Sequence, residues 1–309
     1  MINLQHLKKK SGSRQSGFSI IELLVAMVLS LFLLTALIEI LLNGKQSFNS
    51  ANNLSRLQEN GRVATNLIVS DLKRAGYMGG NSDVPNIFGS SGQTAAAVNC
   101  PAGSTNWGRM VTQRIAGLDD SNAGYACIPN ATYLRGDVLT VRYAAPWIAT
   151  GALSANQLYL RSSLFEGKIF AGSDEATVAN VVLDQPQSVR QIISRAYFVG
   201  DSGRTCNGQA VPSLFRVRLD ADSLPTVDEL LPGVANFQVQ YGINGQYVDA
   251  NAVANWSQVV TVRFWLLIRS ECAESGFVDG RTYTLGNQVI TPADGFRRQL
   301  YSSVVMLRN

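Results

Sequence analysis

The amino-acid sequence predicts an α+β protein in which one long N-terminal helix, transmembrane in its first half, packs on a mostly antiparallel β-sheet head. Two observations carry this prediction. No proline occurs before Pro85, so a helix begun near Phe18 meets no obligate breaker. From Gly136 onward, short runs rich in β-branched and aromatic residues alternate with turn formers, as expected for strands. We therefore expect a basic N-terminal segment over residues 1–17, the helix over 18–76 and the head over 77–309.

The first half of the expected helix, residues 18–42, is apolar enough to span a membrane. Its only charged residues are Glu22 and Glu39, and at about 1.5 Å per residue it covers roughly 37 Å. Basic residues precede it and only Lys45 stands just after it, so the positive-inside tendency predicts a cytoplasmic N-terminus and a translocated head. No small-residue cleavage site follows Leu42, so an uncleaved signal anchor is the plain alternative.

The second half of the expected helix, residues 43–76, is amphipathic. From Leu54 onward, apolar and small residues recur every three or four positions and form one stripe. We expect a bend at Asn43-Gly44 and the end of the helix at Gly76. The stripe predicts that the head packs on this half.

Glu22 lies inside the apolar run, where a lone carboxylate costs about 2.5–3.5 kcal/mol on insertion scales and therefore needs a partner. Cleavage between Gly17 and Phe18 would create an α-amino group one helical turn away. That group would belong either to the same chain or to a neighbour packed with a small axial offset. The charge is thus explained if the bond before Phe18 is cut.

The stretch GFSIIELLVAM, which begins at Gly17, resembles the class III signal of type IV prepilins. In that family a prepilin peptidase cuts after the glycine and N-methylates the new terminal phenylalanine. The resemblance implies that Gly17 is the last leader residue and that Phe18 is the methylated first residue. It also implies that Glu22 aids assembly by pairing with the terminus of a neighbouring subunit.

The basic charge of the chain belongs to its N-terminal segment. The chain has 26 Lys and Arg against 22 Asp and Glu, and four of the basic residues but none of the acids precede Phe18. The rest of the chain is therefore balanced, which argues against direct nucleic-acid binding. The only histidine is His6, so a chain cut after Gly17 has no histidine for catalysis or for a zinc site.

The cysteines predict disulfide bonds. Their even number, their wide spacing, the absence of a C-x-x-C pair and the preceding membrane segment favour an oxidising compartment. Three connectivities are open, and we favour the sequence-local pairs Cys100–Cys127 and Cys206–Cys272 over buried free thiols. We expect no metal site and no cofactor.

The head begins with residues 77–135, which are rich in Gly, Ser, Asn and Ala and predict either a long irregular insertion or a flexible linker. Strand signals follow it. The strongest are a hairpin turn at Asn244-Gly245, a central strand over Val259–Arg269 and a closing strand over Gln299–Arg308. Further strands are expected over residues 137–144, 156–163, 180–184, 195–200 and 214–220.

Three segments of the head, ELLPGVANFQVQYGING, VVTVRFWLLIRS and DGFRRQLYSSVVMLRN, resemble the PilW-type minor pilins. With LQENGRVATNLIVSDLKRAGYMGG at the helix end, the resemblance covers residues 17–80 and 213–309. The group is also similar to the J-type minor pseudopilin of type II secretion.

That resemblance implies a subunit that is not an enzyme and that joins other minor pilins in a membrane complex priming type IV pilus assembly. It implies a place in the bacterial inner membrane with a periplasmic head, then at the pilus tip, and a role in twitching, adhesion or DNA uptake. Its partners would be the prepilin peptidase, other minor pilins and the major pilin, with a tip adhesin as a further candidate. Two alternatives stay open: a minor pseudopilin of type II secretion, and a membrane-anchored binding or adhesive domain with an uncut leader.

Other chemistry is weakly supported by the sequence. Residues 200–203, Gly-Asp-Ser-Gly, match the serine neighbourhood of chymotrypsin-like proteases, but that mechanism needs a histidine base, so we interpret them as a turn. Asp220 with Asp222, or Asp119-Asp120, could hold calcium, although solvated turn residues are the favoured interpretation. We interpret Arg297-Arg298 as ordinary surface arginines.

Overall fold

The computed structural model describes residues 17–90, 100, 103–178 and 185–307. The chain divides into two compact units, one up to Asn52 and one from Asn53 onward, and each is described by itself. The basic residues of the expected leader, His6 and the strand expected over 180–184 lie outside the described residues.

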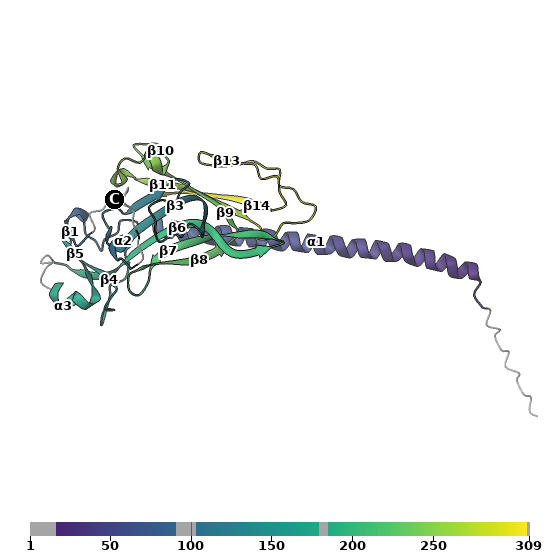
Figure 1. The fold of residues 1–309 in the computed structure, drawn as a ribbon, viewed down its shortest axis with the longest axis horizontal. Helices are drawn as coiled ribbons and strands as arrows, with labels where there is room; N and C mark the ends of the chain where they lie inside the picture. Colours follow the sequence, from purple (N-terminus) through teal and green to yellow (C-terminus); the bar gives the residue numbers. More distant parts are fainter. Residues whose placement is uncertain (1–16, 91–99, 101–102, 179–184, 308–309) are drawn as a thin grey trace, which may run out of the picture. The chain divides into compact units, whose positions relative to one another are not determined.

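Helix α1 runs from Ile20 to Leu72 (Figure 1). The helix is continuous through Asn43-Gly44, where a bend was expected, because a single glycine lowers helix stability by only about 1 kcal/mol. The helix ends four residues before the expected Gly76. Gly76 has a φ of 80°, and its N–H donates to the carbonyl of Arg142 at 2.9 Å, because the chain here already joins the sheet.

The described head contains an eight-stranded sheet, a four-stranded sheet and a two-stranded ribbon. The strands of the eight-stranded sheet are β1 (Ile87–Phe88), β2 (Ile115–Leu118), β3 (Tyr133–Ala144), β4 (Leu158–Ser162), β5 (Gly167–Ala171), β6 (Ser188–Cys206), β7 (Gln209–Leu219) and β8 (Pro225–Pro232). Those of the four-stranded sheet are β9 (Val234–Ile243), β10 (Gln246–Val248), β11 (Thr261–Arg269) and β14 (Arg298–Met306), and the ribbon is β12 (Tyr283–Leu285) with β13 (Gln288–Ile290). The short helices are η1 (Val84–Asn86), α2 (Asn106–Arg109), η3 (Gly172–Asp174), α3 (Glu175–Val178), η4 (Ala250–Ala252) and η5 (Trp256–Gln258).

The larger sheet has the order β1-β5-β4-β6-β3-β2, and the long strand β6 also pairs with β7, which pairs with β8. The smaller sheet has the order β10-β9-β11-β14. The one parallel pairing among these described strands is β1 with β5. The prediction of a mostly antiparallel head behind a long helix is therefore confirmed.

The hairpin signal and the central strand were predicted correctly. Asn244 and Gly245 join β9 to β10 with φ values of 51° and 80°, and two positive φ angles are what a two-residue type I′ turn requires. Strand β11 pairs with β9 on one side and β14 on the other, and its register with β14 is regular over all nine residues.

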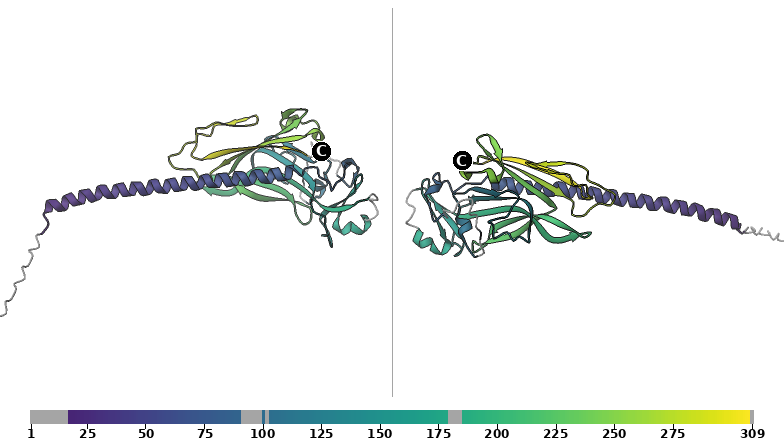
Figure 2. Two further views of the ribbon diagram at one scale, coloured as in Figure 1. Left: turned by 180° about the vertical axis from the view of Figure 1, so that it is seen from behind. Right: turned by 45° about the horizontal axis from the view of Figure 1, so that its top comes forward.

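The core of the head joins the end of α1 to both sheets. The helix contributes Leu57, Ala64, Ile68 and Leu72, which pack with residues of β3, β6 and β7 and with residues of β9, β11 and β14. Figure 2 shows strands of both sheets beside this part of α1. The stripe expected in the second half of the helix is thus the face on which the head is built.

The described part of the insertion over residues 77–135 is packed, so a flexible linker is the wrong interpretation for it. Trp107, Met110, Tyr125 and Ile128 form a second core against Phe198 and Phe215 of the larger sheet. Arg142 of β3 ties this region to the sheet, because its buried guanidinium donates to the carbonyls of Trp107 at 3.2 Å and Gln113 at 3.0 Å. With no described carboxylate among these contacts, burial lowers the pKa of Arg142 to about 10.

Candidate assembly site

The start of α1 is built around a capping box. Ser19 precedes the first helical residue, and its Oγ accepts the N–H of Ile21 at 3.3 Å. A reciprocal hydrogen bond comes from Glu22, three residues later, whose Oε2 accepts the N–H of Ser19 at 3.0 Å. This S-x-x-E pattern satisfies two N–H groups that a helix start otherwise leaves unpaired. Sequence reasoning missed it, although the pattern is legible at residues 19–22.

The capping box leaves part of Glu22 available. The bond to Ser19 uses Oε2, and the residue is exposed in the single chain, as are Gly17 and Phe18. The bond before Phe18 is therefore accessible in this chain, and the Ser19 amide would survive a cut there. The arrangement allows Glu22 to cap its own helix with one oxygen and to present the other to a second group.

The surface of α1 that follows is apolar all round except at Glu39. The segment from Ile20 to Leu42 has large apolar side chains that are about half to four-fifths exposed, for example Ile20 at 81% and Phe32 at 71%. Its hydroxyl groups bond within the helix, since Ser30 donates to the carbonyl of Met27 at 2.9 Å and Thr35 to that of Leu31 at 2.5 Å. By length and composition this helix could cross a membrane. A helix with this surface needs lipid or other helices around it.

Farther along α1, Asp71 fixes the helix to the head. Its carboxylate is fully buried and accepts the Arg195 guanidinium at 2.7 Å and the hydroxyls of Tyr143 at 2.8 Å and Tyr197 at 2.5 Å. These partners come from β3 and β6, so one acid on the helix meets two neighbouring strands. Its burial is compensated by charge and hydrogen bonds.

The pKa values around Asp71 follow from this geometry. Burial, together with the Asp71 charge, raises the pKa of Tyr143 and of Tyr197, so both hydroxyls stay protonated donors. Burial alone would lower the pKa of Arg195, but the adjacent Asp71 charge outweighs it and the net shift is upward. The cluster is a charged structural anchor rather than an acid–base site.

Both pairs of cysteines form disulfide bonds, Cys100 with Cys127 and Cys206 with Cys272. The first closes part of the insertion next to the Trp107 core, and the second joins the end of β6 to the segment after β11. The second bond therefore links the two sheets covalently.

The protease-like fragment is part of strand β6. The Ser202 hydroxyl donates to the carbonyl of Val211 at 2.7 Å, and Asp201 accepts the N–H of Gly203 at 2.9 Å. The interpretation of residues 200–203 as a turn was wrong: they lie where the β6–β7 register shifts between Asp201 and Thr205. The side chains of Asp201 and Ser202 stabilise this irregularity in the strand pairing, and the Ser202 hydroxyl is used in a bond to the backbone.

The acid pairs serve loops. Asp220 accepts the N–H groups of Asp222 at 2.9 Å and Leu224 at 2.8 Å, which closes the turn between β7 and β8. Asp119 accepts the Asn251 amide at 2.7 Å. Among the described residues, no three His, Cys, Asp or Glu side chains gather as a metal site would require.

Arg297 and Arg298 are not ordinary surface arginines. Arg298 is only 7% exposed and holds both oxygens of Asp294, at 2.5 and 2.6 Å, while Arg297 pairs with Glu274 at 2.8 Å. Both lie where the chain enters the closing strand, so their charges fix its start instead of facing solvent. An even charge balance does not reveal these pairs, because Asp294 is only four residues from Arg298 but lies in a loop, and Glu274 is 23 residues from Arg297.

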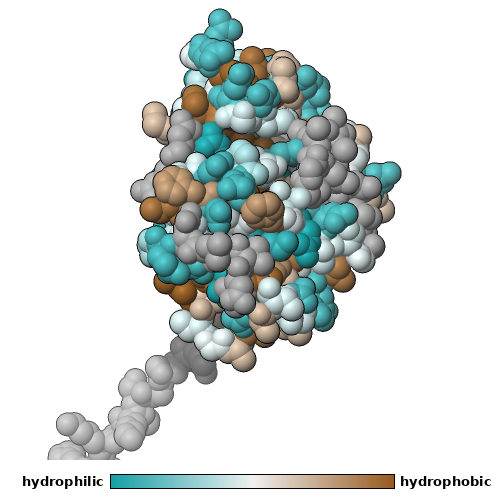
Figure 3. Space-filling view, turned by 90° about the vertical axis from the view of Figure 1, so that its left-hand side faces the viewer, coloured by the Kyte–Doolittle hydropathy of each residue, from teal (hydrophilic) through white to brown (hydrophobic). Residues whose placement is uncertain are grey.

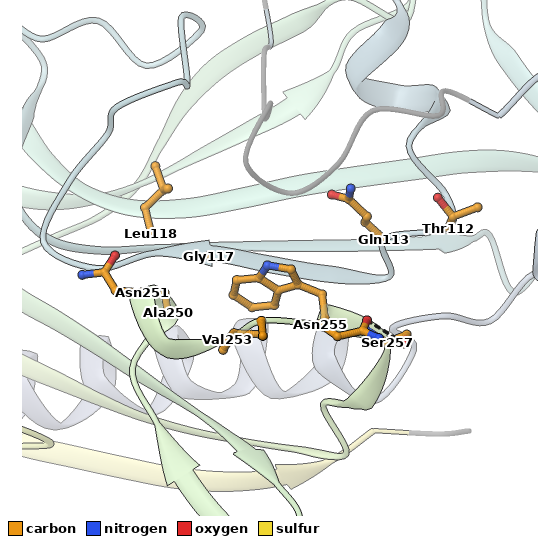
Figure 4. A pocket seen from close by; sticks show the side chains of 11 residues that line it. Thr112, Gln113, Gly117, Leu118, Ala250, Asn251, Val253, Asn255 and Ser257 are labelled. Atoms are coloured by element: carbon orange, nitrogen blue, oxygen red, sulfur yellow. Dashed lines mark hydrogen bonds between the residues drawn. The ribbon is translucent and has the colours of Figure 1, made fainter.

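A groove of about 520 Å³ lies between the segment around β2 and the loop after β10 (Figure 4). Gln113 and Leu118 line one side, and Asn251, Val253 and Asn255 line the other. All of its lining residues are neutral, and Asn255 is occupied by the N–H of Ser257 at 3.0 Å. The groove offers hydrogen-bonding groups but no general acid or base.

The end of the head that faces left in Figure 1 has a mixed surface. Figure 3 shows hydrophobic residues there lying among polar ones. The candidate assembly features of the described chain lie at the start of α1 and just before it: the exposed Gly17-Phe18 bond, the capped Glu22 and the apolar surface that follows.

Two family models match this chain. Residues 196–309 match the model described as PilW, Type IV Pilus-assembly protein W. Residues 12–38 match the prokaryotic N-terminal methylation motif. The first match runs from β6 to the C-terminus, and the second contains Gly17, Phe18 and Glu22.

No curated protein matches the chain significantly. Among solved structures, a type IV-like pilin from Thermus thermophilus is similar over 82% of this chain and 97% of its own, with 12% identity and a TM-score of 0.36. A similarity of that size carries no argument about function.

Proposed function

We propose that this chain is a minor pilin that is processed after Gly17 and assembled through α1, because residues 196–309 match the PilW model and residues 12–38 match the N-terminal methylation motif. The observation that carries the proposal is the start of α1, where an exposed cleavage bond, a carboxylate and an all-round apolar helix follow one another. All three features precede Asn53, where the compact unit that contains the head begins. Together they suit a subunit whose helix is inserted first in a membrane and then in a bundle of similar helices.

The Glu22 carboxylate acts twice in this proposal. It caps its own helix through Oε2 and pairs through its remaining oxygen with the methylated Phe18 amine of a neighbouring subunit. Apolar helix packing supplies most of the association, while a charge pair in an apolar environment is sensitive to axial displacement. The pair therefore fixes the axial register between neighbouring helices.

The remaining parts of the proposal concern place and partners. The subunit would stand in the bacterial inner membrane, with its N-terminus cytoplasmic and its head periplasmic, and would meet the prepilin peptidase there. It would then join other minor pilins in a complex that primes assembly of the major pilin and remains at the fibre tip. Its contribution to twitching, adhesion or DNA uptake would be indirect and non-enzymatic.

The decisive experiment is the mass of the N-terminal peptide of the mature protein. We expect a peptide that begins with N-methylated Phe18, because the motif provides the glycine before the cut and the phenylalanine after it. A mature protein that begins at Met1 would instead favour a membrane-anchored binding domain and would overturn the proposal. Replacing Gly17 by Val should leave the full-length precursor in the membrane.

A deletion strain separates the pilus from the secretion pseudopilus. Loss of surface fibres with normal exoprotein secretion is the expected phenotype. Loss of exoprotein secretion with normal fibres would assign the subunit to a type II secretion machine.

A further inference from the structure

Strand β14 (Arg298–Met306) forms one edge of the four-stranded sheet. It pairs with β11 over its whole length, and among the described strands it has no second neighbour. A nine-residue regular edge is long for a sheet that solvent can reach.

The direction of the free hydrogen-bonding groups of β14 follows from the ladder. Leu307 donates to the carbonyl of Val260 and Ser270 donates to the carbonyl of Arg297, each at 2.9 Å. Because bonded positions alternate in an antiparallel pair, Val305 and Ser303 bond to β11 as well. Ser302 and Val304 occupy the alternate positions, so their N–H and C=O groups point away from β11 and out of the sheet.

The outward-pointing positions carry neutral side chains that suit strand pairing. Ser302, Val304 and Met306 are all exposed on the face away from α1, Val304 to 54% and Met306 to 76%. Arg263 lies opposite Val304 on β11 and could shield the edge, but its guanidinium stacks over the ring of Tyr247, 4.2 Å from the centroid. At the start of the strand the outward carbonyl of Arg298 accepts the Arg281 guanidinium at 2.9 Å, but from Ser302 to Met306 the strand itself carries neither a charge nor a proline.

The same head protects another edge. Strand β8 borders the larger sheet, begins and ends with Pro225 and Pro232, and carries Asp228 and Glu229 in its middle. Proline and charged residues are the usual means by which an edge strand avoids pairing with other chains. The contrast with β8 indicates that the exposed edge of β14 is a surface for pairing with another strand.

We propose that the outer edge of β14 pairs with an extended strand from the head of a neighbouring, different subunit. The incoming strand would continue the four-stranded sheet and place neutral, β-branched side chains over Val304 and Met306. Main-chain bonds to the outward groups of Ser302 and Val304 would supply most of the affinity.

The choice of a different subunit rests on the proposed function. Two copies that share the β14 edge would be related by a two-fold axis, which makes a closed dimer rather than a step in a fibre. Pairing copies head to tail would need a second open edge of similar length. The other border strands among the described residues are β8, which is protected, and β1, β2, β10, β12 and β13, which have two to four residues each.

Hydrogen exchange of individual amides tests the proposal on the full chain. In the detergent-purified chain alone, the amides of Ser302 and Val304 should exchange fast, and those of Ser303 and Val305 slowly. In complexes extracted from cells that assemble the fibre, the outward amides should slow by about tenfold or more. Outward amides that exchange equally fast in both samples would overturn the proposal.

A proline substitution gives the matching functional test. Val304→Pro removes only an outward N–H and is expected to keep the fold, whereas Val304→Thr keeps the N–H and serves as the control. Both variants should be cleaved and methylated, but Val304→Pro should enter fibres several-fold less. Equal incorporation of both variants, or a dimer of the purified chain that Val304→Pro dissolves, would refute the pairing while leaving the proposed function intact. A chain that is never cleaved or incorporated would refute the proposed function itself.

Discussion

At the scale of single residues, Glu22 combines two demands that are usually separate. Its bond to the Ser19 amide stabilises the start of its own helix, and its charge is placed in an apolar stretch where it needs a cationic partner. Capping requires only an oxygen acceptor, whereas pairing with a neighbour's amine requires the negative charge. A variant that keeps one property and loses the other separates them.

Glu22→Gln retains a side-chain oxygen for the Ser19 amide and removes the charge, while Glu22→Ala removes both. Both variants should be cleaved normally, since the Gly17-Phe18 bond is unchanged, and both should enter fibres poorly. The measurement is the ratio of mature protein in sheared fibres to mature protein in the membrane. Normal incorporation of Glu22→Gln alongside failure of Glu22→Ala would show that helix capping suffices and that the amine pairing is wrong.

Asp71 is a second residue whose role depends on its partners. Asp71→Ala would leave the Arg195 charge and two tyrosine hydroxyls without their acceptor in the core, and we expect a loss of about 3–5 kcal/mol in unfolding free energy. Urea denaturation of the full chain in detergent measures it. The control is Glu59→Ala, which breaks an exposed pair with Arg62 and should leave the urea midpoint nearly unchanged. Equal midpoints for the two variants would contradict the anchoring role.

At the scale of elements, the hairpin turn and the central strand were predicted correctly, whereas features that depend on partners distant in the sequence were mostly not predicted. Asn244-Gly245 predicts its hairpin because a type I′ turn is decided by two adjacent residues. Strand β8 was not predicted, because its prolines and acids oppose strand propensity and only pairing with β7 makes it a strand. The sequence alone does not indicate that Asp71 is buried, because its partners lie on β3 and β6, more than 70 residues away.

The contact between α1 and β14 depends on a missing side chain. At Gly61 a Cβ atom would overlap the ring of Tyr301, whose hydroxyl donates to the carbonyl of Leu57 at 3.3 Å. Gly61→Ala should therefore destabilise the head, even though alanine favours the helix by about 1 kcal/mol. Thermal unfolding of the full chain provides the measurement.

The double variant Gly61→Ala/Tyr301→Leu distinguishes the steric reason from a helical one. If the ring is the obstacle, Tyr301→Leu should cost less in the Gly61→Ala background than alone. Gly44→Ala, where no atom lies within 4 Å of the added Cβ, is the control and should not destabilise. Additive effects of Gly61→Ala and Tyr301→Leu would contradict the overlap.

At the scale of the whole molecule, the proposed assembly features lie before residue 43, and the head is held by ion pairs and buried acids of its own. The fold lowers the pKa of some of these acids and raises the pKa of another, Asp137. The hydrogen bonds from Arg298 hold the pKa of Asp294 below its ordinary value. Burial alone would raise the pKa of Asp279, but its bonds to Arg281 and Tyr283 outweigh this and lower it. Such acids stabilise the fold above their ordinary pKa and lose that contribution as the pH falls.

The pKa of Asp137 is shifted in the opposite direction, upward, so this residue makes the stability of the head fall as the pH rises toward neutral. Burial raises its pKa from 3.8 to about 7, although its oxygens accept the N–H groups of Asp120 at 3.0 Å and Val239 at 2.6 Å. The folded chain therefore holds a proton there that the unfolded chain has lost, so this group's contribution is complete below pH 4 and disappears as the pH rises through 7. Between about pH 4 and pH 7, Asp279 and Asp294, whose pKa values are lowered, are already ionised in both states. Asp137 should therefore dominate the change of stability with pH in this range. We expect the urea midpoint of the full chain to fall from about pH 5 to pH 7.5, and to fall distinctly less in Asp137→Asn. A parallel fall in both proteins would show that another group is responsible, and a rise in the native chain would mean that Asp137 is ionised in the fold throughout this range.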